Sequence, residues 1–377
     1  SICSTQLWVS SNMKAEYLDL PNGRVHFPIY LPDATYGVVR TVDAQDLEQV
    51  SVEALVMNTF HLTQKPGSAV IQALGGLHHM SGWHKPIITD SGGFQAYSLI
   101  RQNNKYGCIN DRGIIFYPEG SKRKFQLTPQ KAIQLQIGYC SDIVICLDDC
   151  THVDEDYNAQ RLSVERTIAL AKLCKAEYLK LTAKTSDAGK PRPLIFGVIQ
   201  GGGFKDLRQR CADELLEIGF DGYGFGGWPL DGENQLLTEI IGYTREVIPL
   251  QFPMHALGIG HPKNILASYQ LGYSLFDSAM PTRDARHGRL YTFNNPQQPS
   301  DSGLHGEWFS YFYVDNERNI RSRQPISPFC DCPCCSHYPA GYLYHLFKQG
   351  DPLFMRLATL HNLRFMVQLT DRLRSTP

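Results

Sequence analysis

KPIITDSGGF, residues 85–94, contains the pattern that decides the fold of this sequence. A short, nearly continuous apolar run ends at Asp90, and two glycines and an aromatic residue, Phe94, follow it. Such a run predicts a strand that is buried on both faces, as the strands of parallel sheets are. The glycines predict a tight turn through which the backbone can come close to a ligand.

Seven other apolar runs repeat this pattern before residue 294. They are HFPIYLP (26–32), EALVMN (53–58), SDIVICLD (141–148), LIFGVIQ (194–200), FDGYGFGG (220–227), HALGIG (255–260) and GYSLFD (272–277). Stretches with helical periodicity lie between them, at residues 128–138, 156–179, 209–218 and 233–246. Eight buried strands that alternate with helices favour an α/β fold, the (β/α)8 TIM barrel, over a doubly wound sheet.

The chain of 377 residues is long enough for a barrel and a second module. We expect a catalytic barrel at residues 1–293, with insertions near 100–127, as a pair of hairpins, and near 182–193, as a loop. The polar, turn-rich stretch that begins at residue 294 marks the passage to a zinc-binding module at 294–377. Residues 351–375 predict one long helix, which we expect to pack on the barrel.

The composition excludes several classes of protein. With 42% hydrophobic and 19% charged residues, the chain has a globular composition. It has no apolar run of about 18 residues or more, so no membrane span is expected. Its net charge is −1 at pH 7, so any surface for nucleic acid has to be a local patch. The first residues lack the pattern of a secretion signal, and a reducing cytoplasm is the expected compartment.

Polar residues stand at the ends of the predicted strands, where barrel enzymes carry their catalytic side chains. These ends hold Asn58, Asp90, Asp148, Gln200, Gly226, Gly227, Gly258 and Asp277. Each aspartate alone is readily explained as the cap of the following helix. Three carboxylates beside an amide and several glycines indicate a site instead, because an unpaired carboxylate is costly at the end of a buried strand.

A compact group of thiols lies near the C-terminus, at Cys330, Cys332 and Cys335. Structural zinc takes four Cys or His ligands in a tetrahedron, so this spacing predicts one structural Zn²⁺. The candidates for the fourth ligand are Cys334, His337, His345 and His361. Of these, His361 lies on the predicted C-terminal helix. A metal ion bound by the three cysteines and by a histidine of this helix would have a closed site. The alternative is a group of free surface thiols.

Arginines follow the last predicted barrel strand and also precede the cysteines. The first group is Arg283, Arg286 and Arg289, and the second is Arg318, Arg321 and Arg323. Guanidinium groups suit phosphates and guanine edges, so both groups are candidates for an RNA-facing surface. A single arginine is more often solvated or paired with a carboxylate.

Seven segments, in order along the chain, resemble the signature segments of the tRNA-guanine transglycosylase (queuine tRNA-ribosyltransferase) family. They are ATYGVV (34–39), NTFHL (58–62), DSGGFQ (90–95), SDIVICLDDC (141–150), GVIQGG (197–202), HALGIGHP (255–262) and FDSAMPTRDARHG (276–288). The resemblance implies a pentosyltransferase that exchanges guanine at the anticodon wobble position of tRNA for a 7-deazaguanine base, preQ1 or queuine. It also implies a homodimer whose partners are the tRNA and the free base.

The resemblance further implies roles for individual residues. Asp277 would be the nucleophile at C1′ of the target ribose, and Asp90 would be the general acid and base, as paired carboxylates act in retaining glycosidases. The base-binding residues would be Phe94, Asp148, Gln200, Gly227, Trp228, Leu257 and Gly258. The RNA contacts would be Arg283, Arg286 and Arg289, with the last two the better matches, and the zinc ligands Cys330, Cys332, Cys335 and His361.

The loop GGWPLDG, residues 226–232, departs from the family pattern, which has a smaller residue after the glycines. Trp228 in this loop either narrows the base pocket, stacks on a larger base or only packs. Two smaller departures are Asp149, where bacterial members often have Glu, and Phe94, where they have Tyr. The departure at Trp228 bears on the identity of the incoming base more than on the reaction type.

Three other hypotheses compete with an active tRNA enzyme. They are a transglycosylase that places a 7-deazaguanine in DNA, a non-catalytic RNA-binding partner subunit, and a zinc-containing nucleic-acid-binding module with an incidental barrel. A partner subunit need not retain both Asp90 and Asp277, and the last hypothesis leaves the carboxylates at the strand ends unexplained. We therefore favour the tRNA enzyme.

Overall fold

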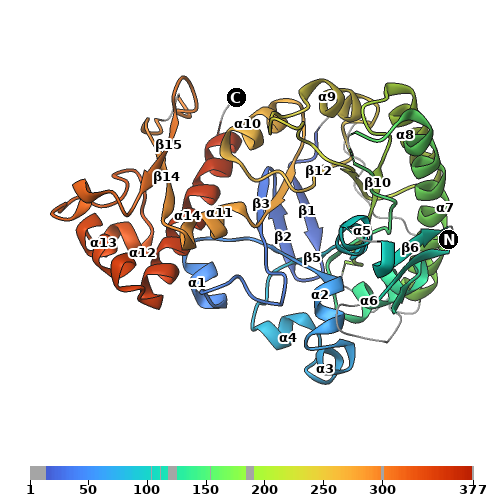
Figure 1. Ribbon diagram of the computed structural model, residues 1–377, viewed down its shortest axis with the longest axis horizontal. Coiled ribbons are helices and arrows are strands. Elements are labelled where there is room, and N and C mark those ends of the chain that lie inside the picture. The colour runs from blue at the N-terminus through green and yellow to red at the C-terminus, as the bar shows by residue number, and fades with distance from the viewer. Residues whose placement is uncertain are drawn as a thin grey trace.

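The computed structural model describes residues 14–102, 104–110, 112–117, 125–152, 154–183, 191–298 and 301–375. Its centre is a parallel barrel surrounded by helices, with a smaller C-terminal module at one side (Figure 1). The barrel has eight strands, which lie in the order β3-β13-β12-β11-β10-β9-β5-β4. They are β3 (Ile29–Pro32), β4 (Leu55–Met57), β5 (Ile87–Thr89), β9 (Ile143–Ile145), β10 (Leu194–Ile199), β11 (Gly222–Phe225), β12 (Met254–Ala256) and β13 (Leu275–Ser278). A parallel bridge between Asp33 and Val56 joins the two ends of this order. The TIM barrel is confirmed, and all eight predicted strands are present.

Helices follow the strands and cover the outside of the barrel. They are α1 (Ala44–Gln49), α2 (Thr59–Gln64), α3 (Ser68–Ala73), α4 (Leu77–Ser81), α5 (Gly93–Gln102), α6 (Pro129–Gly138), α7 (Tyr157–Thr182), α8 (Lys205–Ile218), α9 (Thr238–Glu246), α10 (Pro262–Gln270) and α11 (Met280–Arg286). Side-chain caps fix where two of the predicted helices begin. Thr128 accepts a hydrogen bond from the Lys131 N–H at the start of α6, and Asp156 accepts one from the Ala159 N–H at the start of α7.

Three predicted segments differ from the structure, the first being the helix predicted at residues 209–218, since α8 already begins at Lys205. The helix predicted from residue 233 begins only at Thr238, because the backbone N–H groups of Glu233 and Gln235 both donate to Asp231 Oδ1 and hold a turn there. In the insertion near 100–127, α5 continues to Gln102. The predicted hairpins then share a central strand in an antiparallel sheet of β6 (Gly107–Asn110), β7 (Gly113–Phe116) and β8 (Phe125–Leu127). Residues 184–190 of the predicted loop lie outside the described residues.

A short antiparallel hairpin that the sequence did not predict closes the floor of the barrel. Its strands are β1 (Tyr17–Leu20) and β2 (Gly23–His26). Leu20, Val25 and Phe27 from this segment join the apolar side chains inside the barrel. The cavity described below therefore lies at the opposite end, where the strands reach their carboxyl ends.

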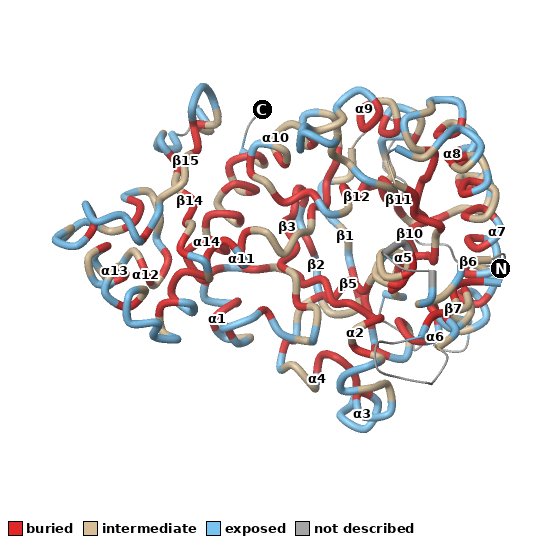
Figure 2. The backbone as a smooth tube through the Cα atoms, viewed as in Figure 1, coloured by how far each residue is buried: buried red, intermediate tan, exposed pale blue. Residues whose placement is uncertain are grey.

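The C-terminal part consists of a hairpin, β14 (Arg289–Phe293) with β15 (Phe309–Tyr313), and the helices α12 (Pro333–His337), α13 (Ala340–Gln349) and α14 (Pro352–Arg374). Short 3-10 turns occur at Asn104–Tyr106 and Glu317–Asn319. Helix α14, capped by Asp351, matches the predicted long helix and contacts both α11 and β3. Figure 2 shows buried backbone running from the barrel into α14 and β14. We retain a division near residue 293 as a proposal, since one apolar cluster crosses it.

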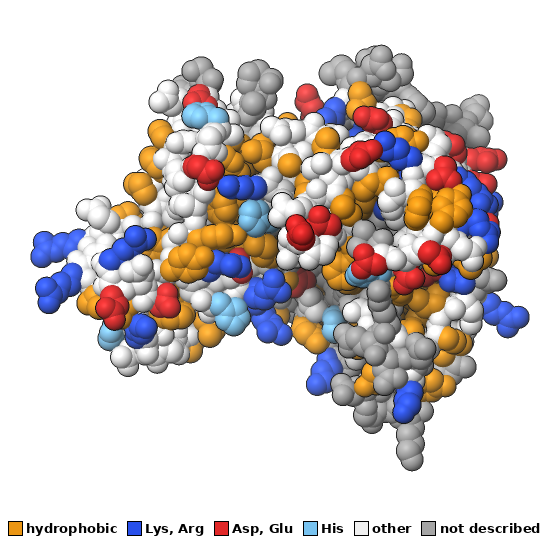
Figure 3. Space-filling view, turned by 45° about the horizontal axis from the view of Figure 1, so that its top comes forward, with side chains coloured by type: hydrophobic (Ala, Val, Ile, Leu, Met, Phe, Trp, Pro, Cys, Tyr) orange, Lys and Arg blue, Asp and Glu red, His pale blue; other side chains and the backbone are white. Residues whose placement is uncertain are grey.

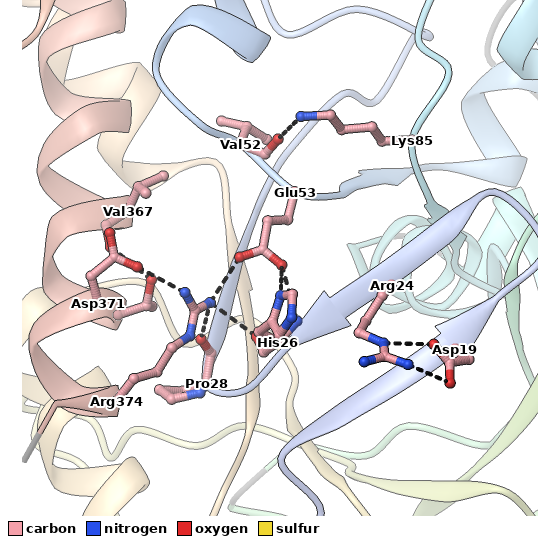
Figure 4. Close-up of polar contacts among 11 residues, drawn as sticks. Asp19, Arg24, His26, Pro28, Val52, Glu53, Lys85, Val367, Asp371 and Arg374 are labelled. Carbon is pink, nitrogen blue, oxygen red and sulfur yellow. Dashed lines mark hydrogen bonds and ion pairs between the residues drawn. The ribbon is translucent and has the colours of Figure 1, made fainter.

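Arg374 ties the end of α14 to the barrel floor, as Figure 4 shows. Its guanidinium donates to the carbonyl oxygens of His26 and Pro28, at 3.0 and 2.9 Å, and to the Glu53 carboxylate at 3.1 Å. It also pairs with Asp371 on its own helix, at 2.7 Å. Within the described ranges, no helix combines the length and the apolar character needed to cross a bilayer.

Candidate active site and metal cluster

A cavity of about 530 Å³ opens at the carboxyl ends of the barrel strands. Of the residues implicated by the sequence, those that line it are Asn58, Asp90, Phe94, Asp148, Gly226, Gly227, Trp228, Leu257, Gly258 and Asp277. Gln200 is fully buried and reaches the cavity through a hydrogen bond to Asp148. Ligand sites of barrel enzymes lie at this end of the fold, so the structure places most of the candidate residues where a substrate would bind.

The alternation of strand side chains explains why the polar groups converge. Ile88, Val198 and Leu275 point into the barrel and belong to its interior cluster. The residues two positions later in each segment, Asp90, Gln200 and Asp277, therefore point the same way, just above the apolar layer. On these three strands, the sequence places a polar residue where the apolar interior ends and the cavity begins.

Asp90 lies in the cavity wall among hydrogen-bond donors. Asn58 Nδ2 donates to Oδ2 at 2.6 Å, and the Thr59 N–H and hydroxyl both donate to Oδ1 at 3.1 Å. Gly92 has a φ of +77°, which turns its N–H onto Oδ1 at 3.0 Å. Burial raises the pKa of Asp90 to about 7, although the hydrogen bonds from Thr59 and Gly92 lower it. A carboxyl with such a pKa can both give and take a proton near neutral pH.

Asp277 is held through one of its two oxygens. His255 Nε2 lies 2.7 Å from Oδ1, and the Gly258 N–H donates to the same oxygen at 3.0 Å. His255 is buried on β12, which pairs with β13 beside Leu275. Within the described part of the chain, no hydrogen bond reaches Oδ2. This arrangement orients the carboxylate and leaves one oxygen available to a reacting atom in the cavity.

Asp148 and Gln200 form a second polar edge of the cavity. Gln200 Nε2 donates to Asp148 Oδ2 at 2.6 Å. Burial raises the pKa of Asp148 to about 6, because the effect of burial is larger than the opposite effect of this hydrogen bond. Gln200 Oε1 is buried and has no hydrogen-bond partner among the described residues. Since buried polar atoms normally have a hydrogen-bond partner, this edge is suited to bind a polar ligand.

Two half-exposed aromatic rings also line the cavity. The centroids of Phe94 and Trp228 are 5.8 Å apart, with the planes inclined at 61°. His152 also lies near Trp228, with its ring centroid 5.6 Å away. The indole therefore lies near two other rings and also lines the cavity, where it can meet a planar ligand.

Two residues of this site, Asp33 and His255, were not predicted from the sequence. Asp33 lines the cavity and directly follows the apolar run 26–32, so it was the strand-end residue of that run. His255 was visible only as a polar residue at the beginning of the run 255–260. Its importance depends on the adjacent strand, because the pairing of β12 with β13 brings it to Asp277.

The arginines after β13 lie outside the cavity lining. Arg283 is exposed, and Arg286 is half-buried near Arg40 and Asp33. Arg289 is paired with Asp284 at 2.7 Å, and its guanidinium lies over the Tyr311 ring. Figure 3 shows Lys and Arg side chains at the notch between the barrel and the C-terminal module. The exposed second group, Arg318, Arg321 and Arg323, lies in that module.

A separate cluster of soft donor atoms lies in the C-terminal module. The ligand atoms of Cys330, Cys332, Cys335 and His361 all lie within 4.8 Å of one another. The His361 Nε2 lies 2.8 Å from the carbonyl oxygen of Tyr291, which directs Nδ1 toward the thiols, 3.2 Å from Cys335 Sγ. Three thiols and one imidazole at these separations could hold one metal ion, consistent with a structural zinc. Cys334, His337 and His345, the other candidates from the sequence, lie outside this group.

Fold and cavity together define the class of the protein, a (β/α)8 barrel enzyme with its polar site at the carboxyl ends of the strands. A model of the queuine tRNA-ribosyltransferase family matches residues 11–376. The chain therefore belongs to the queuine tRNA-ribosyltransferase family, which confirms the resemblance found in the sequence, and it is a pentosyltransferase.

Individual relatives cover nearly the whole chain. The queuine tRNA-ribosyltransferase of Psychrobacter sp. (strain PRwf-1) is 35% identical over 353 residues, which are 94% of this chain and 86% of that protein. The protein of the same name from Halothermothrix orenii is 32% identical, and the match covers 97% of this chain and 90% of that protein. That of Acinetobacter baumannii (strain SDF) is 34% identical, with 98% and 91% covered.

Proposed function

We propose that this chain is a tRNA-guanine transglycosylase, which exchanges guanine at the wobble position of a tRNA anticodon for a 7-deazaguanine base. The observation that carries the proposal is the pair of carboxylates in one cavity with different surroundings. Asp90 is buried among donors with a pKa of about 7, whereas Asp277 is fixed through Oδ1 by His255 and Gly258. Paired carboxylates in unequal environments take separate roles in glycosyl transfer.

The reaction would proceed as a double displacement. Asp277 Oδ2 attacks C1′, the C1′–N9 bond breaks and the protonated form of Asp90 gives its proton to the departing guanine. The ribose is then held on Asp277 as an ester while the free base leaves. Asp90 next takes the N9 proton of the incoming base, whose nitrogen attacks C1′ and releases Asp277. The target nucleotide must leave its stack to enter the cavity, which costs least in a single-stranded loop.

The second edge of the cavity would bind the base. Asp148 can accept the N1–H and 2-amino hydrogens of guanine on its two oxygens, while the Gln200 amide and the Gly227 N–H can donate to O6. Phe94 and Trp228 offer faces for stacking, and Leu257 and Gly258 close the opposite wall. Arg283, Arg286 and Arg289 would contact the RNA around the target, and Arg286 lies near the cavity residue Asp33.

The metal of the C-terminal cluster would be one structural Zn²⁺. Cys330, Cys332, Cys335 and His361 supply the thiol and imidazole donors that zinc prefers, and four protein ligands leave no position for a substrate. When bound, the ion would fix the cysteine knuckle to α14, beside the arginines of the same module. Bonding of His361 Nε2 to Tyr291 O adds a link to β14.

The direct test of the proposal is the covalent intermediate. Wild-type protein incubated with unmodified tRNA and no free base should yield a protein–RNA adduct that survives denaturation, and added radiolabelled guanine should appear in the tRNA. Asp277→Asn should give neither product. If Asp277→Asn still exchanged guanine, Asp277 would not be the nucleophile. Labelling of DNA but not of tRNA would favour the DNA-modifying hypothesis. A wild-type chain that binds tRNA without exchange would favour a non-catalytic subunit.

The incoming base would be preQ1 or queuine, and Trp228 would help to select it. Competition of preQ1, queuine and guanine for the same tRNA should identify the preferred base. Trp228→Leu should change the ratio of the two deazaguanines more than the rate of guanine exchange, because Trp228 is half-exposed in the cavity lining, whereas Asp148 and Gln200 would hold the edge that all three bases share. Equal effects on all three bases would assign Trp228 to packing.

We further propose a homodimer that works in the cytoplasm. A row of aromatic rings on and beside α13 supports an interface, since Tyr338 stacks on Tyr342 and Tyr342 on His345, and Tyr342 is exposed. Light scattering should give twice the mass of the chain. A monomer at assay concentration would contradict this part of the proposal.

A further inference from the structure

Asp33 is a cavity carboxylate that has no role in the proposed reaction. It directly follows β3, which pairs with β13 so that Leu31 lies opposite Asp277 and Pro32 opposite Ser278. Leu31 is fully buried in the barrel interior. A side chain two positions later points to the same side, so Asp33 faces the cavity next to the strand that carries Asp277.

One oxygen of Asp33 is held and the other is available. Thr35 Oγ1 donates to Asp33 Oδ1 at 2.6 Å. Across the described ranges, no hydrogen bond reaches Oδ2. Burial raises the pKa of Asp33, the Thr35 hydrogen bond lowers it, and the neighbouring Asp277 raises it further. The side chain therefore presents an acceptor oxygen to the cavity in a fixed orientation.

The stereochemistry of a nucleoside determines what this oxygen can meet. The base and the 2′-hydroxyl lie on opposite faces of the ribose. A nucleophile that displaces the base attacks C1′ from the face opposite to it, and this is the face that carries the 2′-hydroxyl. When Asp277 reaches C1′, the 2′-hydroxyl on the adjacent carbon must lie beside Asp277 rather than beside Asp90.

The two flanks of Asp277 differ in chemistry. On the β12 side, His255 and the Gly258 N–H are already engaged with Asp277 Oδ1. On the β3 side, Asp33 offers an unengaged acceptor. A hydroxyl group donates readily to a carboxylate, and such charge-assisted hydrogen bonds are the stronger ones.

We propose that Asp33 is a specificity-determining residue that accepts a hydrogen bond from the 2′-hydroxyl of the target nucleotide, so that the site favours RNA over DNA. The inference rests on the proposed glycosyl transfer. Hydrogen bonds to the hydroxyl next to the reacting carbon strengthen as positive charge develops on the sugar, so this contact would act mainly in the transition state. The 2′-hydroxyl is also the group by which a protein distinguishes RNA from DNA.

The test uses two anticodon stem-loop RNAs that differ only at the target guanosine, which is ribo in one and 2′-deoxy in the other. The readout is kcat/KM for incorporation of radiolabelled guanine, so the choice of deazaguanine does not enter. Asp33→Val should lower kcat/KM on the ribo substrate by about tenfold to a hundredfold. The deoxy substrate should be nearly unaffected, so the ribo-to-deoxy ratio falls toward one.

Controls make the result specific. The ratio is compared between variants, so the different intrinsic reactivity of a deoxynucleoside cancels. Activity on the deoxy substrate also shows that Asp33→Val is folded. Asp19→Asn removes a carboxylate from the floor hairpin and should leave both the rates and the ratio unchanged.

Two outcomes would overturn the inference. An unchanged ratio in Asp33→Val, or an equal loss on both substrates, would show that Asp33 does not read the 2′-hydroxyl, while the proposed function would stand. No exchange by the wild-type chain into either RNA would overturn the proposed function, and the inference would fall with it.

Discussion

His255 Nε2 lies 2.7 Å from Asp277 Oδ1, and this contact joins two adjacent barrel strands at the cavity. Because the imidazole is buried and the carboxylate is partly exposed, the histidine can fix the direction from which Asp277 approaches a ligand. His255 would therefore be a positioning residue, which acts through Asp277 and does not touch the substrate.

His255→Leu should lower kcat of guanine exchange by about tenfold to a hundredfold, because a nucleophile displaced by about 1 Å loses its alignment. KM for tRNA should change little. His255→Gln, whose amide can still donate, should recover part of the rate. His78→Leu alters another buried histidine, which lies against the Lys85 carbonyl, and should leave kcat unchanged. A larger effect on KM than on kcat would contradict the positioning role.

The pH dependence should report the environment of Asp90. Burial raises its pKa to about 7, and the first step needs the protonated form, so kcat/KM for tRNA should fall as pH rises through about 7. Asn58→Ser removes the donor to Oδ2, which favours the charged form, so the pKa should rise and the fall in activity should move to higher pH.

Serine is chosen at position 58 because it can still cap α2, as Asn58 does through the His61 N–H. Asn316→Ser, at a cap remote from the cavity, is the matched control and should leave the pH profile in place. If the fall in kcat/KM moved to lower pH in Asn58→Ser, this would contradict the assignment of that fall to Asp90.

The zinc content of the protein should depend on the four clustered ligands and not on the neighbouring residue Cys334. Cys335→Ala and His361→Ala should lose bound zinc and unfold at lower temperature, whereas Cys334→Ala should retain it, because Cys334 lies outside the cluster. Binding with free zinc a thousandfold above Kd stabilises a fold by about 4 kcal/mol. Elemental analysis and thermal unfolding measure both effects. Loss of zinc from Cys334→Ala alone would overturn the assigned ligand set.

Arg374→Ala should lower the free energy of unfolding by about 1–3 kcal/mol, because it removes the donor to the His26 and Pro28 carbonyl oxygens and to Glu53 Oε1. Arg24→Ala breaks an exposed pair with Asp19 in the same region and should cost less than about 1 kcal/mol. Figure 4 shows both arginines. Chemical denaturation compares the variants, and equal losses would show that the contacts of Arg374 contribute no more than a surface pair.

The barrel could be predicted because strands buried on both faces appear as apolar runs, and the polar residue at the end of each run indicated the site. The hairpin at Tyr17–His26 was missed, since its strands are short and mostly exposed. His255 could not be assigned a role, because its partner lies on another strand. The spacing of the cysteines likewise left the fourth metal ligand open, and the packing of α12 against α14 brings His361 to them.

The packed floor of the barrel has a kinetic consequence. Leu20, Val25 and Phe27 fill the end opposite the cavity, so the described residues leave one mouth for every molecule that enters or departs. In the proposed double displacement, the departing base and its replacement would then use this opening one after the other. Double-reciprocal plots against tRNA and base should accordingly be parallel, the signature of the ping-pong order that a covalent intermediate and a single opening together impose.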